Sequence, residues 1–313
     1  MALSVALFVG MFMSMVAITL FLRHRGILGD ASKPVLSTIL MDVIGPAVIF
    51  HAFASAQPKE EHLLAATTVY AAELLCAVLA YVVGKWILRL ERGSLGVFIV
   101  AGTFGSTSLI GNALVQILFK SDPSLVSMSM IVSQFGFGLP ANTIGILLAI
   151  HFGSSAAGQP ITTHLKRFAV VPCMIALYAG LLWSLLGLPV GGYGLEVIFG
   201  TCMFVGAALP FVSAMLVGLS LEKINVRKDL GVLLAVSVIA LLIEPLIVSR
   251  LLNVLSVDQQ TRLITILFSA MPATPLAVVL AVQYGGDATL ASKLSTATLV
   301  LSAASLPLIV QLV

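Results

Sequence analysis

The chain has 313 residues, of which 59% are hydrophobic and only 9% are charged, and its formal net charge is +3. An ordinary soluble domain has roughly a quarter of its residues charged, so this composition indicates an integral membrane protein surrounded by the lipid bilayer. The positive charge is too small and too dispersed to indicate nucleic-acid binding. The three cysteines lie in apolar segments without the spacing of a metal site or a disulfide, and we expect no cofactor.

Ten apolar segments follow one another along the chain, each near the ~20 residues that cross a bilayer as a helix. We expect these spans at residues 2–22, 34–55, 63–88, 95–119, 124–151, 165–187, 194–220, 230–250, 261–284 and 289–312. The first span lacks a basic leader and a clear cleavage site, so we expect a retained helix and not a signal peptide. The connecting loops are short and leave no room for a soluble domain.

The distribution of lysine and arginine predicts the orientation of the chain. The loops after the odd-numbered spans contain 12 of these residues, and the remaining loops contain 4. Basic residues concentrate on the cytoplasmic side of membrane proteins, so the first set of loops is predicted to be cytoplasmic. Both termini are therefore predicted to lie outside.

The second span contains two titratable residues, Asp42 and His51, which stand nine positions apart. In a regular helix this spacing places them on different turns and on poorly aligned faces. A structural hydrogen bond or an interfacial position is therefore favoured over a ligand role for His51.

Two acidic residues lie deep within apolar spans. Glu73 is about ten residues, or ~15 Å, into the third span, and Glu244 is similarly deep in the eighth. Charged side chains are costly at that depth, so such acids usually face a cavity, pair with another group or become protonated. We predict that at least one of them takes part in proton or sodium coupling. The alternative is a neutral acid that bonds to another helix, and Glu244 can also repair the backbone before Pro245.

The fourth span is rich in residues that weaken a helix, namely Gly102, Gly105 and Gly111. Side chains that can reach freed backbone groups lie among them: Ser106, Thr107, Ser108 and Asn112. These features predict an interruption of the helix. The alternative is that the glycines only let neighbouring helices pack closely.

In the fifth span, Gly136, Gly138 and Pro140 cluster just before Asn142. All three of the clustered residues weaken a helix. They indicate either a simple kink or a hinge at Pro140 and Asn142 beside a site formed by other spans.

The ninth span is interrupted by two prolines, Pro272 and Pro275. Proline donates no amide hydrogen and clashes with the preceding helical turn, so this pair predicts a broken helix near the middle of the membrane. Lipid cannot satisfy the backbone groups that such a break frees. The segment is therefore predicted to be buried in protein or to line a polar cavity, which makes it a candidate binding site.

Matches at a constant offset of 167 residues suggest that the two halves of the chain are related. The matched pairs include Thr107 with Thr274, Gln116 with Gln283, and Pro140 with Pro307. Five spans followed by five more would place the halves in opposite orientations. We therefore expect an all-α membrane protein with ten transmembrane helices in two inverted repeats, the first at residues 1–151 and the second at 165–313.

This repeat pairs the fourth span with the ninth, and two broken helices that meet near the midplane form a crossover. A crossover points half-helix N-termini at one place, where partial positive charge and unpaired amide hydrogens can hold an anionic group without a buried arginine. The predicted binding residues are Gly105, Ser106, Thr107, Ser108, Asn112, Gln116, Pro272, Ala273, Thr274 and Gln283.

Short motifs at residues 25–30, 45–51, 104–111, 270–277 and 281–287 follow one another across nearly the whole chain. In this order and spacing they resemble the auxin efflux carrier family of membrane transporters, which includes plant PIN-type carriers and bacterial permeases for malonate and malate. PIN-type carriers have a proline and asparagines at the first crossover, where this chain has glycine, threonine and serine. They also have a long cytoplasmic loop after the fifth span, and the short loop here is similar to the bacterial form and argues against auxin as the natural substrate.

The resemblance implies a scaffold formed by spans 1, 2, 6 and 7 and a mobile transport unit formed by spans 3–5 and 8–10. It also implies a homodimer through the scaffold, elevator-like movement of the crossover site, and a location in the plasma membrane, which is the inner membrane in bacteria. We therefore expect a secondary transporter of a small organic anion, with a carboxylate as the recognised group.

Three other functions remain open. A sodium-coupled symporter of the bile-acid type or a cation/proton antiporter would use a similar crossover, and a receptor would bind the ligand without moving it. An intramembrane enzyme is disfavoured because the sequence has no H-E-x-x-H motif and no plausible aspartate pair.

Overall fold

The computed structural model describes residues 2–29, 31–55, 59–119, 122–154, 169–192, 194–221, 226–255 and 257–312. This part of the chain is helical and contains no strand. Seven of its helical segments are long and apolar enough to cross a membrane: Ser4–His24, Ser32–Ser55, Glu60–Ile87, Ser124–Phe152, Leu195–Ser220, Asp229–Leu252 and Ala288–Ile309. The predicted class, an all-α protein with several membrane spans, is therefore confirmed.

The other three predicted spans are shorter helices in the structure. The fourth is divided into α5 (Arg92–Thr103) and a second half made of η3 (Thr107–Gly111) and α6 (Asn112–Leu118), and the ninth into α15 (Gln259–Ser269) and α16 (Leu276–Tyr284). The sixth is represented by α10 (Pro172–Leu185), which begins at Pro172 after a turn at Val170 and Val171; residues 165–168, where that span is predicted to begin, lie outside the described residues. Two of these three spans, the fourth and the ninth, are the ones in which helix-breaking residues predict an interruption.

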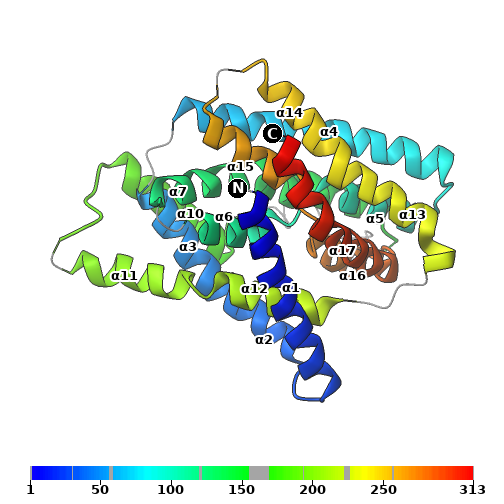
Figure 1. Ribbon diagram of the computed structural model, residues 1–313, viewed down its shortest axis with the longest axis horizontal. Helices are drawn as coiled ribbons and strands as arrows, with labels where there is room; N and C mark the ends of the chain where they lie inside the picture. The colour runs from blue at the N-terminus through cyan, green and yellow to red at the C-terminus, as the bar shows by residue number, and fades with distance from the viewer. Residues whose placement is uncertain are drawn as a thin grey trace.

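The remaining elements follow the predicted order of spans (Figure 1). They are α1 (Ala2–His24); α2 (Ser32–Thr38), η1 (Ile39–Ile44) and α3 (Gly45–Ser55); α4 (Glu60–Val82) and η2 (Val83–Ile87); α7 (Pro123–Val132), η4 (Ser133–Gly138), η5 (Ala141–Gly145) and α8 (Ile146–Phe152); α11 (Leu195–Gly206) and α12 (Leu209–Ser220); α13 (Val226–Val238), η6 (Ile239–Ile243) and α14 (Glu244–Leu252); and α17 (Ala288–Leu312). The elements labelled η are π-helical turns within longer helices.

Three of the π-helical turns share one cause, a proline in the middle of a span. At the end of η1, η4 and η6 the residue just before Pro46, Pro140 or Pro245 donates its amide hydrogen to the carbonyl five positions back. A proline ring clashes with the carbonyl four positions back, and one extra residue in the turn relieves this contact. Each such turn also rotates the helix that follows it.

Two groups of helices can be distinguished, and contacts of α1 with α17 and of α3 with α7 join the first group to other helices. In the first group, α10 and α11 contact α3, and α12 contacts α1. Close approach depends on glycine here: a Cβ on Gly180 of α10 would lie 2.8 Å from Phe53 Cβ, and one on Gly218 of α12 would lie 2.8 Å from Thr19 Cβ. In the second group, α4 and α8 contact α5, and α13 and α16 contact α17.

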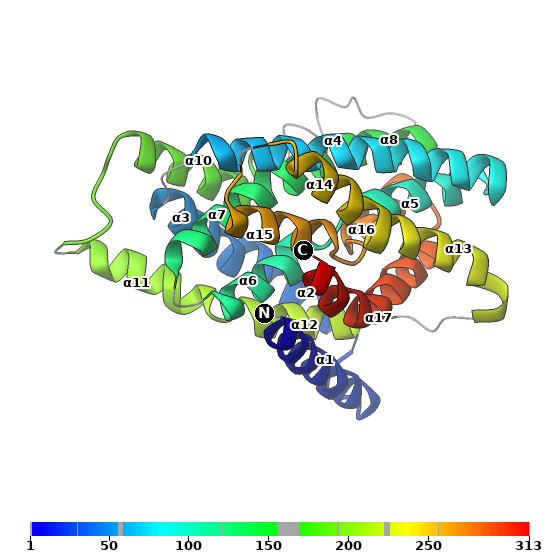
Figure 2. The ribbon, with the colours of Figure 1, turned by 45° about the horizontal axis from the view of Figure 1, so that its top comes forward.

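The helix α4 also packs along α14, and the two lie side by side in both views of the ribbon (Figures 1 and 2). Large apolar side chains such as Leu185 and Phe204 stand exposed on outer faces, by 81% and 83% respectively. Exposure of this kind is expected of a protein whose surroundings are hydrocarbon.

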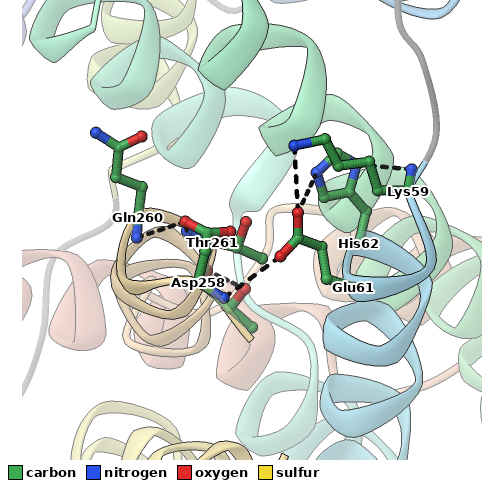
Figure 3. Close-up of polar contacts among 7 residues, drawn as sticks. Lys59, Glu61, His62, Asp258, Gln260 and Thr261 are labelled. Atoms are coloured by element: carbon green, nitrogen blue, oxygen red, sulfur yellow. Dashed lines mark hydrogen bonds and ion pairs between the residues drawn. The ribbon is translucent and has the colours of Figure 1, made fainter. Parts of the chain in front are cut away.

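A polar cluster ties the start of α4 to the start of α15 (Figure 3). The Asp258 carboxylate caps α15 by accepting the amide hydrogens of Gln260 (2.8 Å) and Thr261 (3.1 Å), and the Asp258 amide donates to Glu61 Oε2 (3.4 Å). Glu61 also pairs with Lys59 at 3.4 Å. Partial burial would raise the pKa of Asp258, but the hydrogen bonds from Thr261 and Gln260 outweigh it and hold that pKa below its ordinary value.

Candidate functional site

The interruptions of the fourth and ninth spans lie directly against each other. Gly105 and Ala273 form an isolated antiparallel bridge. The Ser106 amide donates to the Pro272 carbonyl (2.7 Å), and the Thr274 amide donates to the Phe104 carbonyl (3.0 Å). Each break therefore satisfies backbone groups freed by the other, as is required where no water is at hand.

The residues at the contact explain why the two breaks can meet. Phe104 is extended, and a Cβ on Gly105 would lie 3.3 Å from both Cβ and the carbonyl oxygen of Met271, tighter than an ordinary contact. Glycine at 105 thus lets the two backbones approach. A third element completes the junction, since the Ala273 amide donates to the Thr298 hydroxyl of α17 at 3.0 Å.

Two helices begin at this junction and continue away from it. The half formed by η3 and α6 begins at Thr107, and α16 begins at Leu276. The first amide groups of a helix lack partners within it, and together with the helix dipole they carry partial positive charge. At the start of α16 these amides are already occupied: that of Leu276 donates to Thr274 Oγ1 (3.3 Å), that of Ala277 to the Thr274 carbonyl (3.1 Å) and that of Val278 to the Pro275 carbonyl (3.0 Å), so this end contributes partial positive charge only. The junction therefore brings two helix N-termini to one place.

A cavity of about 530 Å³ lies against the junction, between α2, η1 and α12 on one side and η3, η5 and α16 on the other. Six of the predicted functional residues line it: Gly105, Ser106, Thr107, Ser108, Asn142 and Thr274. One cationic side chain, Lys33 of α2, lines it as well. This cavity is the candidate substrate site.

A second cavity of about 330 Å³ adjoins the first, and Met41, Ser108, Leu109, Gly138 and Asn142 line both. Its other polar lining comes from Asn112, predicted as a binding residue, and from Asp42 and Gln134. Ser108 and Asn142 therefore stand where the two cavities meet.

A chain of hydrogen bonds orients the polar groups between the cavities. Asn112 Nδ2 donates to Ser133 Oγ (3.3 Å), and Ser133 Oγ donates to Thr107 Oγ1 (3.1 Å). Within the described residues, two buried atoms close to this chain, Ser106 Oγ and Asn112 Oδ1, have no hydrogen-bond partner. Buried polar atoms without a partner are costly, so these two favour a bound polar ligand or ordered water.

Not every predicted binding residue lies at the cavities. Gln116 is half-buried on α6 and Gln283 is exposed on α16, and neither lines either cavity. Pro272 and Ala273 are buried in the junction itself and border only a small void of about 30 Å³. Pro140, a predicted hinge residue, is buried between η4 and η5, and the Asn142 side chain donates to the Gly138 carbonyl (2.8 Å).

The two membrane acids lie elsewhere. Glu73 of α4 and Glu244 of α14 are buried where these helices pack, close enough for their charges to interact. Both oxygens of Glu73 and Oε1 of Glu244 have no hydrogen-bond partner among the described residues. Neither side chain lines either cavity. Coupling of transport to protons or sodium through this pair stays a prediction.

Three lining residues were missed by sequence reasoning: Lys33, Asp42 and Gln134. Asp42 and Gln134 share a signal that could have identified them, because each is a polar residue in the turn just before a mid-span proline. Such a turn is where a helix adopts π geometry, and π turns often occur at functional sites.

Comparisons with known proteins found sequence relatives over most of the chain. A family model described as membrane transport protein matches residues 4–310. An uncharacterized transporter of Methanothermobacter thermautotrophicus is 28% identical over 293 residues, which cover 92% of this chain and 91% of the relative. An uncharacterized transporter of Methanocaldococcus jannaschii is 22% identical over 279 residues, 87% of each chain.

Proposed function

Because this chain belongs to the auxin efflux carrier family of membrane transport proteins, we propose that it is a secondary transporter that moves a small organic anion across the membrane. The recognised group in this proposal is a carboxylate. Family membership supports transport, and the choice of an anion rests on the chemistry of the junction.

The observation that carries the proposal is the pair of helix N-termini beside the 530 Å³ cavity. Partial positive charge at helix starts favours a bound carboxylate; at α16 the first amide hydrogens are already paired, so this end acts through its charge alone. Ser108 and Thr274 add hydroxyl groups at the cavity wall, and Ser106 Oγ, buried beside them, has no protein partner within the described residues. A carboxylate that accepts hydrogen bonds here needs no buried arginine.

The proposal includes an elevator mechanism in which ten helices form two inverted repeats that cross at the junction. The first group of helices, α1, α3 and α10–α12, forms the scaffold together with α2 and η1, and the second group, with the junction, is the moving unit. The position of the larger cavity between α2 and α12 of the scaffold and η3, η5 and α16 of the moving unit supports this division. Similar affinity in the inward and outward states would let the site alternate without trapping its cargo.

Two further parts of the proposal rest on the sequence. The family resemblance supports a homodimer formed through the scaffold in a plasma membrane, and the excess of basic residues in one set of loops supports outside termini.

A second candidate function is cation/proton antiport. It is favoured by the buried pair Glu73 and Glu244, since acids inside a membrane usually take part in ion or proton movement. Antiport without an organic substrate would distinguish it from the first proposal.

The test is uptake of radiolabelled malonate, malate and indole-3-acetate into proteoliposomes, by the native chain and by two variants of Thr274. Thr274→Pro removes the amide that donates to Phe104 and is expected to lower uptake about fivefold or more, since an unpaired buried carbonyl costs roughly 1–3 kcal/mol. Thr274→Ser keeps the amide and the hydroxyl and should retain most of the activity. No uptake of any acid by folded native protein would contradict the proposal and favour antiport.

A further inference from the structure

We propose that Lys33 is a specificity-determining residue, whose positive charge attracts the transported anion into the larger cavity from one face of the membrane. This inference rests on the proposed function and adds a residue to its site. The junction and its hydroxyl groups still hold the carboxylate, and Lys33 acts from the opposite wall of the same cavity.

Lys33 gives a positive charge to the cavity in which the anion is proposed to bind. Of the described residues that line this 530 Å³ cavity, Lys33 alone is ionisable, and the other polar side chains are hydroxyl groups and the amide of Asn142. The acidic residue Asp42 lines the adjoining cavity and not this one. A cavity lined by charge of one sign concentrates ligands of the opposite sign, so this cavity favours anions over cations.

The wall that carries Lys33 continues to the point where the two cavities meet. Ser37 lies four positions after Lys33 and Met41 four positions further, and all three line the larger cavity. With a rise of ~1.5 Å per residue, the eight positions from Lys33 to Met41 cover about 12 Å of this wall. Met41 also lines the second cavity, as Ser108 of the junction does. A polar path therefore connects Lys33 with the junction.

The side chain of Lys33 suits an attraction that needs no fixed geometry. Lys33 is the second residue of α2 and is half-buried. It interacts with another group of the protein, and because an ammonium group has three donor hydrogens, it can bridge that group and an anion. Lysine carries a compact, strongly hydrated charge on a flexible stem. Its attraction for an anion is therefore moderate in strength and acts over several ångströms.

Three polar residues of the cavity come from helix ends on one side of the membrane. Lys33 follows the loop after the first span, Ser220 ends α12 before the loop after the seventh, and Ser292 follows the loop after the ninth. In the proposed order of ten spans, these loops lie on the face with the excess of basic residues, which is predicted to be cytoplasmic. The cavity therefore extends from the junction toward this face, and an anion from the cytoplasm meets Lys33 as it enters.

Lys33 and the junction belong to different parts of the proposed elevator. Lys33 lies on α2 of the scaffold, whereas Ser108 and Thr274 lie at the junction of the moving unit. Movement of this unit toward the other face carries the bound anion away from Lys33. The charge therefore strengthens binding at the cytoplasmic face and does not act at the other face, where the cargo can leave or enter without it.

Lys85 offers a matched control position. It is exposed on η2, it lines neither cavity, and its loop is predicted to lie at the same membrane face as Lys33. Lys33→Met and Lys85→Met remove the same charge and keep a long, unbranched side chain. Lys33→Arg keeps the charge, so it separates the loss of charge from the loss of a lysine.

The experiment uses inside-out and right-side-out membrane vesicles, which present the cytoplasmic and the outer face to the medium. The substrate is whichever of malonate, malate or indole-3-acetate the native chain transports. In inside-out vesicles Lys33→Met should raise KM about fivefold and keep kcat within about twofold of native, as expected for the loss of one charge pair in a hydrated cavity. Lys33→Arg and Lys85→Met should have the native KM there, and in right-side-out vesicles all variants should have it. Salt at about 0.5 M should reduce the effect of Lys33→Met, because it screens the charge.

Two outcomes in the vesicles would overturn the inference: a native KM of Lys33→Met in inside-out vesicles, or an equal rise of its KM at both faces. Absence of transport by the native chain would instead contradict the proposed function itself.

If Lys33→Met does not fold, acetylation of the native protein decides the question. Acetic anhydride modifies accessible lysines, and mass spectrometry gives the rate at each position. A saturating concentration of the transported acid should slow acetylation of Lys33 about threefold or more, because the bound anion covers the ammonium group, and should leave Lys85 unaffected. Equal rates at Lys33 with and without the acid would refute the inference.

Discussion

A single hydroxyl group of α17 satisfies the Ala273 amide at the junction between the two interrupted spans. Thr298 is fully buried, its hydroxyl donates to the Leu294 carbonyl of its own helix (2.9 Å), and its oxygen accepts the Ala273 amide hydrogen (3.0 Å). Thr298→Val keeps the shape of the side chain but leaves the Ala273 amide buried without a partner. Leaving a buried donor unsatisfied costs about 1–3 kcal/mol.

Thr265→Val is the matched control for this change. Thr265 is equally buried, and its hydroxyl donates to the Thr261 carbonyl of its own helix at 2.6 Å. Bonds of this kind within a helix add little to stability. The free energy of unfolding, measured by reversible denaturation in mixed micelles, should therefore fall by at least about 1 kcal/mol more for Thr298→Val than for Thr265→Val. Equal losses would refute the claim that α17 holds the junction through this bond.

Two other changes test the packing and the capping of the helices. Gly180→Ala should lower the free energy of unfolding by about 1–3 kcal/mol, because the new methyl group would lie 2.8 Å from Phe53 Cβ. Gly10→Ala should not lower it, because a Cβ there has nothing within 4 Å. Thermal denaturation of both variants checks this difference. Asp258→Ala should cost about 1 kcal/mol near neutral pH, where the ionised side chain caps α15. Since the pKa of Asp258 is lower in the folded protein than its ordinary value of 3.8, this stabilisation is present above that value and is lost as pH falls through the folded pKa. If the stability difference between Asp258→Ala and the native protein stays constant as the pH falls into the acid range, this predicted loss of stabilisation is wrong.

The sequence predicted where the helices break but not which way their faces turn. Pro272 and Pro275 have an unambiguous effect on a helix, and α15 and α16 end and begin beside them as expected. Gln116 and Gln283 matched in the repeat but line neither cavity. The π-helical turn η3 precedes Gln116 and rotates the following helix by about 100°, so a face extrapolated from the regular period is wrong there. Gln283 follows no π-helical turn and lies on the exposed face of α16.

The same rotation explains why Asp42 escaped notice. The spacing of Asp42 and His51 predicts their faces only for a regular helix, but Asp42 lies within η1, whose extra residue changes the faces that the two side chains occupy. Cavities formed by side chains from five spans depend on such rotations and on the packing of distant helices. Neither quantity is encoded by hydropathy or by the spacing of polar residues along one segment.

The central claim is that an organic anion occupies the cavity beside the junction, which adjoins the second cavity at Ser108. Ser108 lines both cavities there, and Leu147 of α8 is an exposed apolar residue that lines neither. The most direct measurement is saturable acid uptake by proteoliposomes that contain native protein, Ser108→Phe or Leu147→Phe. The account predicts that Ser108→Phe blocks uptake by filling this cavity and that Leu147→Phe leaves uptake unchanged. Undiminished uptake by folded Ser108→Phe would contradict it.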